Sequence, residues 1–236
     1  MDGEPNIATV AALIGDAGRA AMLTALVGGR ALPAGELAAA AGMSPSAASA
    51  HLAKLIDGGL LAVEREGRHR YYRLAGPGVA SILESLASLV GQPSRPTAAR
   101  TPQARALRHA RTCYDHLVGE LGVAVAMALE SRGLLALADG KRLDVTSAGV
   151  TWFAAVLGID ANALRPGRHG IACRCLDWTE RRHHLAGPLG TQMLRRCFDL
   201  GWLTNTPGVR AVQLSPSGRD SLYQTPYLVT AFAQVR

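Results

Sequence analysis

Residues 35–74 read GELAAAAGMSPSAASAHLAKLIDGGLLAVEREGRHRYYRL, and this stretch decides the fold of the N-terminal part of the chain. The alanine-rich segment Glu36–Ala41 predicts a short helix, and Gly42–Met43 predicts the turn that ends it. Ser44 and Pro45 then supply the N-cap serine and the first-turn proline of a second helix. Two short helices joined by a tight turn predict a helix-turn-helix.

The second helix has one apolar stripe and one small, polar end. Leu52, Leu55 and Ile56 form the stripe, which we expect to face the core. The residues at its start are small or polar, so its backbone could approach base edges in a DNA major groove. We therefore expect it to read DNA through Ser44, Ser46, Ala47, Ser49 and His51.

A basic hairpin follows this helix. Gly58–Gly59 ends the helix, and Leu60–Val63 and Arg70–Leu74 predict two strands around a tip at Glu64–His69. Cations at such a tip can bind DNA phosphates, and such contacts position the protein on DNA without reading the base sequence. The residues expected to contact phosphates are Arg65, Arg68, His69 and Arg70.

The motifs S-P-S-A-A-S-A-H-L-A-K-L, G-G-L-L and E-G-R-H-R-Y-Y-R-L together resemble the ArsR/SmtB family of bacterial winged-helix repressors. The resemblance covers roughly residues 6–90. It implies a homodimer whose two reader helices meet successive half-sites of a palindromic, double-stranded DNA operator. By the same resemblance, segments 7–14 and 79–86 would be the first and last helices, packed against their mates across the dimer axis.

Length and composition fit such a regulator. The 236 residues suffice for about two domains, and a hydrophobic content of 48% argues against a largely disordered chain. No run approaches the roughly 18 apolar residues of a membrane span, and the N-terminus lacks the regions of a signal peptide. Four cysteines without a framework spacing indicate reduced thiols. We therefore expect a cytoplasmic protein without a membrane partner.

The net charge of +7 is unevenly distributed along the chain. Residues 1–90 hold seven Lys and Arg against eight Asp and Glu, so this part is nearly neutral. Residues 91–111 carry five arginines, three prolines and no acid, as a solvated linker or an extra phosphate contact would. We expect a DNA-binding and dimerisation domain over 1–90, a Pro/Arg-rich linker over 91–102 and an effector-sensing domain over 103–236.

The C-terminal part repeats the helix-and-hairpin pattern of the N-terminal part. We expect a long helix from about 102 to 131, then hairpins over 133–145 and 200–214 that resemble the wing. A second clean reader helix is missing from the sequence, which favours sensing over DNA binding. The expected fold class is α+β and mainly helical: an N-terminal winged helix-turn-helix, then a helical domain with short hairpins or a degenerate second winged helix.

This C-terminal part also holds all four cysteines and five of the seven histidines. On the expected long helix, His109, Cys113 and His116 would share one face. In an extended segment, Cys173 and Cys175 would point to the same side. Thiolates and imidazoles together suit a zinc-like or softer metal ion, which is the cofactor that this inventory allows.

The family resemblance narrows where a sensing site could lie. Metal-sensing members carry their ligands where this chain has residues 32–37 and 82–86, and neither segment supplies them. The tail resembles a longer branch of ArsR-like regulators, in segments 111–117 and 175–187, which we expect to meet in the fold. The candidate sensing residues are Cys113, His116, Cys175, Asp177 and His184.

Three interpretations of these residues remain open. They form a metal site, a redox or electrophile switch that pairs Cys175 with Cys113 or Cys173, or a structural core in which Asp177 caps a helix opening at Trp178. A small organic ligand is compatible with all three. The aromatic residues that could line its pocket are Trp152, Phe153, Trp178, Phe198 and Trp202.

Two other classes of function compete with a regulator. An enzyme with a Cys/His-based C-terminal domain and an accessory winged helix is the alternative, because these side chains can supply nucleophilic catalysis. The sequence lacks a nucleophile elbow, a P-loop, a dinucleotide fingerprint and a zincin motif, so we expect no enzyme. A protein-docking module would need an apolar outer face on the reader helix, and the sequence places small and polar residues there.

Overall fold

The computed structural model describes residues 7–67, 69–89, 101–206 and 209–224. The chain divides into two compact units, Met1–Leu83 and Glu84–Arg236, and the boundary falls within helix α5 (Pro77–Leu89). The linker expected over 91–102 lies outside the described residues except for its last two positions.

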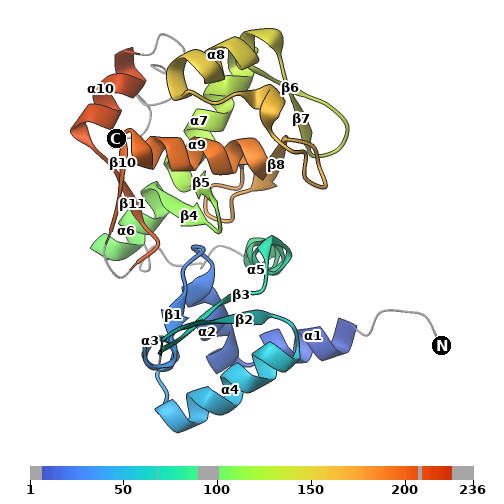
Figure 1. Cartoon of the computed structure of the whole chain (residues 1–236), viewed down its shortest axis with the longest axis vertical. Helices are drawn as coiled ribbons and strands as arrows, with labels where there is room; N and C mark the ends of the chain where they lie inside the picture. The colour runs from blue at the N-terminus through green and yellow to red at the C-terminus, as the bar shows by residue number, and fades with distance from the viewer. Residues whose placement is uncertain (1–6, 68, 90–100, 207–208, 225–236) are drawn as a thin grey trace, which may run out of the picture. The chain divides into compact units, whose positions relative to one another are not determined.

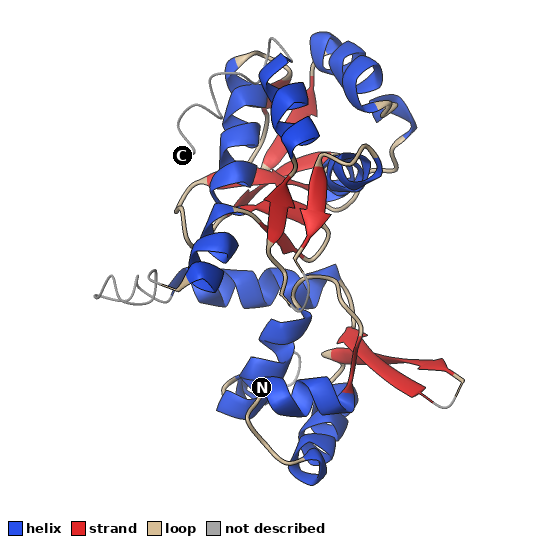
Figure 2. Cartoon of the chain, turned by 90° about the vertical axis from the view of Figure 1, so that its left-hand side faces the viewer, coloured by secondary structure: helices blue, strands red, loops and turns tan. Residues whose placement is uncertain are grey.

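The first unit is a helix-turn-helix with an antiparallel β-ribbon (Figure 1). Its strands are ordered β1-β3-β2, and Figure 2 shows the β2–β3 ribbon extending beyond the helices of this unit. The helix-turn-helix, the wing and the first helix predicted from the sequence are confirmed. The elements before α5 are α1 (Ile7–Ile14), α2 (Ala17–Leu26), β1 (Leu32–Pro33), α3 (Ala34–Ala40), α4 (Pro45–Asp57), β2 (Leu61–Glu66) and β3 (His69–Leu74).

Helix α4 presents a narrower apolar face than the sequence predicted. Ala48, Leu52 and Leu55 are buried against the first unit's core. Ile56 was expected to join them but is 36% exposed. On a helix it lies about 100° from Leu55, at the edge of the buried arc, because successive residues turn by that angle.

The second unit is an α+β fold around a four-stranded antiparallel sheet, ordered β6-β7-β8-β9. Two further hairpins, β4–β5 and β10–β11, complete it, and its core gathers buried side chains of α7, α8 and α9. Its elements are α6 (Pro102–His109), β4 (Arg111–Cys113), β5 (His116–Val118), α7 (Gly119–Ser131), β6 (Leu135–Leu137), β7 (Arg142–Val145), α8 (Ser147–Leu157), η2 (Ala161–Ala163), β8 (Ala172–Leu176), β9 (His183–Ala186), α9 (Gly187–Asp199), β10 (Leu203–Asn205), β11 (Val212–Leu214) and α10 (Pro216–Gln224).

The expected long helix over 102–131 is wrong. Helix α6 ends at His109, and the chain then forms the β4–β5 hairpin before α7 begins. The reason is tertiary: the Thr112 N–H donates to the Arg210 carbonyl at 3.0 Å, so β4 is held in extended form by a segment almost a hundred residues away. The helical spacing in this stretch is therefore coincidental. The hairpins expected over 133–145 and 200–214 are confirmed as β6–β7 and β10–β11.

A hairpin followed by a helix occurs twice in this unit with similar sequences. CYDHLVGELG (113–122) leads from β4–β5 into α7, and CLDWTERRHHLAGPLG (175–190) leads from β8–β9 into α9. Each helix opens at a glycine in the left-handed region, Gly119 at φ 84° and Gly187 at φ 82°. The packing is reciprocal, because α7 packs on β9 while α9 packs on β5. The two copies thus form a pseudo-symmetric pair joined along β5 and β9.

Among the described helices, none is by itself both long and apolar enough to cross a membrane; α1 and α2 pass only as a bent pair, by length and composition.

Candidate functional site

The first half of α4 is an open surface of small residues. The Ser44 hydroxyl caps the helix by accepting from the Ala47 N–H at 3.3 Å. Ser46, Ala47 and Ser49 are exposed, and the Ser49 hydroxyl donates to the Pro45 carbonyl, which leaves its oxygen free to accept. The predicted reading face is therefore accessible and presents short side chains.

His51 departs from its predicted place on this face. Its Nδ1 lies 3.3 Å from an Asp16 carboxylate oxygen and 3.5 Å from a guanidinium nitrogen of Arg19, and its side chain is only 25% exposed. Arg19 also donates to the Leu13 and Ala12 carbonyls, both at 2.7 Å. His51 thus helps to hold α4 against the first turn of α2.

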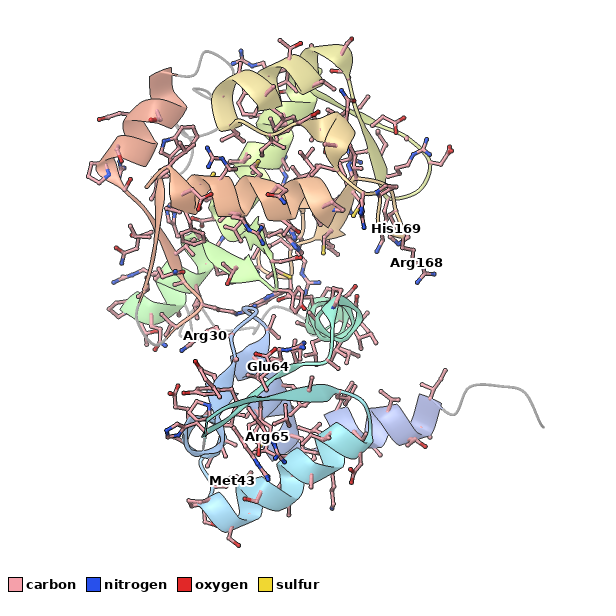
Figure 3. All side chains as sticks on the ribbon, in the orientation of Figure 1. Arg30, Met43, Glu64, Arg65, Arg168 and His169 are labelled. Atoms are coloured by element: carbon pink, nitrogen blue, oxygen red, sulfur yellow. The ribbon has the colours of Figure 1, made fainter. Side chains whose placement is uncertain are left out.

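The wing carries its cations in opposed positions. Arg65 faces Arg70 across the β2–β3 ribbon, and Glu66 faces His69. Like charges directly opposite each other destabilise a ribbon, so a phosphate bound between the two arginines would relieve that repulsion. Both are exposed, and Figure 3 labels Arg65 on the ribbon. Arg68 lies outside the described residues.

The second unit brings cysteine and histidine side chains together in its interior. Cys113 pairs with His116 across β4–β5, and Cys175 pairs with His184 across β8–β9. The two histidine rings stack with their centroids 4.9 Å apart. The possible ligand atoms of His116, Cys175 and His184 all lie within 4.8 Å of one another. We call these four residues the Cys/His cluster.

A carboxylate orients one of the two imidazoles. His116 Nδ1 lies 3.1 Å from Asp115 Oδ1, and Asp115 Oδ2 accepts from the Thr191 hydroxyl at 2.9 Å. Burial lowers the pKa of His116, but Asp115 and the Cys175 sulfur outweigh it and raise the pKa to about 9. Asp115 was not among the candidate sensing residues expected from the sequence.

Burial and close neighbours also shift the pKa values of Cys175 and His184. The neighbouring Cys113 thiol lowers the pKa of Cys175 most, burial opposes this, and the two imidazoles add to the lowering. Burial lowers the pKa of His184, which is 1% exposed. Within the described part of the chain, His116 Nε2 and both ring nitrogens of His184 are buried without a hydrogen-bond partner.

Asp177, expected in the sensing site, is occupied elsewhere. One carboxylate oxygen accepts from Arg111 at 3.0 Å and from the Gly119 N–H at 2.8 Å. The other accepts from the Thr179 N–H and hydroxyl and from the Glu180 N–H. Burial raises the pKa of Asp177, but Arg111 and these donors bring it down to about 2. The carboxylate caps a turn, where a helix had been expected, and has no lone pair left for a ligand.

The two other cysteines differ in their surroundings. Cys173 is half-buried on β8, two residues from Cys175, as the extended segment predicted. Cys197 lines an apolar pocket together with Trp152 and Trp202, and burial raises its pKa to about 12. Of the five aromatic residues expected to line a ligand pocket, these two tryptophans do so.

The remaining aromatics have other roles. Phe153 is fully buried in the core, Phe198 packs at its edge, and Trp178 lies under the Arg111 guanidinium at 4.8 Å.

Sequence reasoning missed a buried ion pair between Arg210, which lies just before β11, and Glu84 of α5. Arg210 donates to Glu84 at 2.9 Å and to the Thr112 carbonyl at 3.4 Å, and Glu84 is 6% exposed. It also missed Asp115 as a partner of His116. The repeated motif H-L-[VA]-G-x-L-G, at 116–122 and 184–190, was the available signal, because it marks the two histidines as equivalent.

Comparisons with known proteins agree with the first unit and extend over most of the chain. A helix-turn-helix domain pattern matches residues 14–64. An HTH-type transcriptional regulator of Bacillus subtilis (strain 168), YdfF, is 41% identical over 215 residues, which cover 91% of this chain and 94% of that protein.

Solved structures similar to the chain cover about a third of it. NolR from Sinorhizobium fredii is 27% identical over 39% of this chain and all of its own (TM-score 0.34). The AntR antimony-specific transcriptional repressor is 32% identical over 36% of this chain and 76% of its own (TM-score 0.33). A homodimeric winged helix-turn-helix domain from Mycobacterium bovis, a possible ArsR-family regulator, is 32% identical over 38% of this chain and 89% of its own (TM-score 0.32).

The relative of similar length and the helix-turn-helix match agree with the reader helix and wing on the first unit. The chain belongs to the helix-turn-helix family of DNA-binding transcriptional regulators.

Proposed function

We propose that this regulator is a homodimeric repressor that leaves a palindromic operator when an effector binds its second unit. The observation that carries the proposal is the surface of the first unit. Exposed Ser46, Ala47 and Ser49 on α4 stand beside a wing that opposes Arg65 and Arg70. Short side chains suit close approach to base edges, and paired arginines suit phosphates.

Exposed apolar side chains on the helices at the two ends of the first unit support dimerisation. Helix α1 has no buried residue, and Ile7 on it is 75% exposed. On α5, Ile82 and Leu86 are 46% and 41% exposed. Large apolar side chains exposed on these helices are costly in water, and a second copy of the chain would cover them symmetrically.

The Cys/His cluster supports an effector site in the second unit. Its buried, unpartnered nitrogens and close thiols are unusual for a core that serves packing alone. An effector can release the operator only if it binds the DNA-free form more tightly than the bound form. The effector class is a metal ion, an oxidant or a small molecule.

An enzyme remains the alternative function, and one arrangement favours it. Asp115, His116 and Cys175 follow one another as an orienting carboxylate, a base and a nucleophile would. A chemical activity lost in the Cys175→Ser variant, with operator binding unchanged, would support that alternative.

Selection of binding sites from random duplex DNA by the purified full chain tests the main proposal. We expect an inverted repeat whose half-site centres lie about one helical turn, roughly 10 base pairs, apart. A transcription assay on that sequence should then show repression. A single unrepeated site, or activation in place of repression, would contradict the proposal.

A further inference from the structure

We propose that Cys113, His116, Cys175 and His184 form a four-ligand site for a divalent d10 metal ion of the zinc class. The inference rests on the proposed function and sharpens it, because it names the chemical class of the effector. The site would lie wholly within the second unit, where the two hairpin-and-helix copies meet.

The internal repeat places the donors as two equivalent pairs. Each copy contributes one cysteine and one histidine that face each other across its own hairpin. Since β5 contacts β9, the two pairs face each other. A pseudo-symmetric arrangement of this kind yields two sulfurs and two nitrogens, which is the ligand count of a closed tetrahedral zinc site.

For three of the four donors the distances require only a small contraction, and the fourth, Cys113, neighbours one of them. The donor atoms of His116, Cys175 and His184 lie within 4.8 Å of one another, and the Cys113 thiol neighbours the Cys175 sulfur. Around a tetrahedral zinc ion, with bonds of about 2.0–2.3 Å, donors lie about 3.5 Å apart. Rotation of the side chains about their existing strand positions can supply the difference of roughly an ångström, since strand pairing fixes only the backbones.

The histidine nitrogens that have no hydrogen-bond partner are the positions at which a metal ion would bind. Both ring nitrogens of His184 and Nε2 of His116 are buried without a hydrogen-bond partner among the described residues. A buried polar atom left unsatisfied costs roughly 1–3 kcal/mol. A metal ion would satisfy one nitrogen of each ring. His116 is already oriented for this, because its other nitrogen is held by Asp115, as in a carboxylate–histidine–metal arrangement.

The donor set selects the kind of ion. Sulfur and imidazole ligands favour zinc-class and softer ions over magnesium or calcium, which prefer oxygen. The nearby carboxylates do not compete for the metal. Asp115 already pairs with His116, and both oxygens of Asp177 accept hydrogen bonds from other groups.

The same geometry links the site to helix α5. Cys113 ends β4, whose Thr112 carbonyl accepts from Arg210, and Arg210 holds Glu84 of α5. Contraction of the cluster around a metal would displace β4 and so act on that ion pair. Helix α5 then continues into the first unit, where a shift would bear on the proposed dimer.

The test uses the full chain, reduced and stripped of metal by a chelator, titrated with Zn²⁺ and separately with Co²⁺. We expect one ion per chain and a thiolate-to-cobalt charge-transfer band. Cys175→Ser and His184→Gln should weaken binding by about 100-fold or more. Cys173→Ser is the matched control, a cysteine on the same strand outside the cluster, and it should bind as the wild type does.

Asp115→Asn guards against misfolded variants, because its side chain is 42% exposed and it ligates nothing. It should keep the melting temperature and lose about 10-fold in zinc affinity. Wild-type protein that binds neither ion, a Cys175→Ser variant that binds normally, or a Cys113–Cys175 disulfide formed with peroxide in protein that binds no metal would overturn the proposal.

Because the titration contains no DNA, its result is independent of the proposed function. Operator affinity is then measured with and without Zn²⁺ by fluorescence anisotropy. Zinc binding that leaves this affinity unchanged supports the site and overturns only its role in release. Failure to bind any operator overturns the proposed function and leaves the metal titration to decide the site.

Discussion

The reading surface and the Cys/His cluster are built in opposite ways. The proposed reading surface comes from one contiguous stretch, residues 35–74, and it exposes the side chains of Ser46, Ala47, Ser49, Arg65 and Arg70. The cluster joins two hairpins whose cluster cysteines, Cys113 and Cys175, stand 62 positions apart, and its histidines are buried. A surface that meets DNA needs only local helix and turn signals, whereas a buried donor set depends on how distant strands pair. Changes at the two sites should therefore differ in kind as well as in size.

The largest effect should come from the buried support of the cluster. Asp177→Asn keeps the shape of the side chain but leaves the Arg111 guanidinium, whose side chain is fully buried, without its counter-charge. We expect a loss of about 3–5 kcal/mol in the free energy of unfolding of the second unit. Urea unfolding followed by tryptophan fluorescence measures it, since all three tryptophans lie in this unit.

The matched control is Asp144→Asn, which removes an exposed ion pair with Arg142. It should cost less than about 1 kcal/mol. Equal losses in the two variants would mean that Asp177 does not support the fold as its contacts indicate.

On the reading surface, charge removal should affect DNA affinity and leave stability unchanged. Arg65→Ala with Arg70→Ala removes two exposed cations from the wing. We expect operator affinity to fall roughly 10–100-fold, with a shallower dependence on salt, because fewer counterions are released. Electrophoretic shifts over a series of salt concentrations measure both.

The second unit offers the control for this variant. Lys141→Ala with Arg142→Ala removes two exposed cations from the β6–β7 hairpin, which resembles the wing. Operator affinity should stay near the wild-type value. A loss equal to that of the wing variant would assign DNA contacts to the second unit as well.

A smaller effect is expected at the proposed dimer surface. Leu86→Glu places a charge on an exposed apolar position of α5 and should weaken self-association by about 10-fold or more, since a buried charge must be desolvated. Sedimentation equilibrium measures the association. Leu137→Glu is the control, because Leu137 is 55% exposed on β6. If both variants associate as the wild type does, α5 does not form the interface.

The smallest effect should be seen at a single base-reading position. Ser46→Ala removes an exposed hydroxyl from the first turn of α4 without altering its cap. We expect a change of about 1–3 kcal/mol in preference between base pairs at one operator position, and little change in binding to random DNA. Competition between single-base operator variants measures this. Uniform weakening on every sequence would indicate a phosphate contact instead.

Predictions from the sequence succeeded where local signals were redundant. The start of α4 is specified by Ser44 and Pro45, and the wing by two strands around Gly67, which lies at φ 58°. They were wrong at 102–131, where one long helix was expected but backbone bonds to a distant segment hold a hairpin. Asp177 was grouped with the wrong partners for the same reason, since Arg111 reaches it only in the folded unit.

The sequence by itself determined the second helix of the helix-turn-helix, the basic wing and the concentration of all four cysteines and five of the seven histidines in the C-terminal part. Caps, glycines and apolar periods act between neighbours, so they can be interpreted without a fold. Tertiary structure alone decided that His51 faces Asp16 and that Asp177 neutralises Arg111. The family resemblance led us to expect that segments 111–117 and 175–187 meet, and the strand pairing decided how Cys113 and His116 lie against Cys175 and His184. Those contacts depend on the pairing of strands and on which charges burial forces together, and both are properties of the whole folded unit.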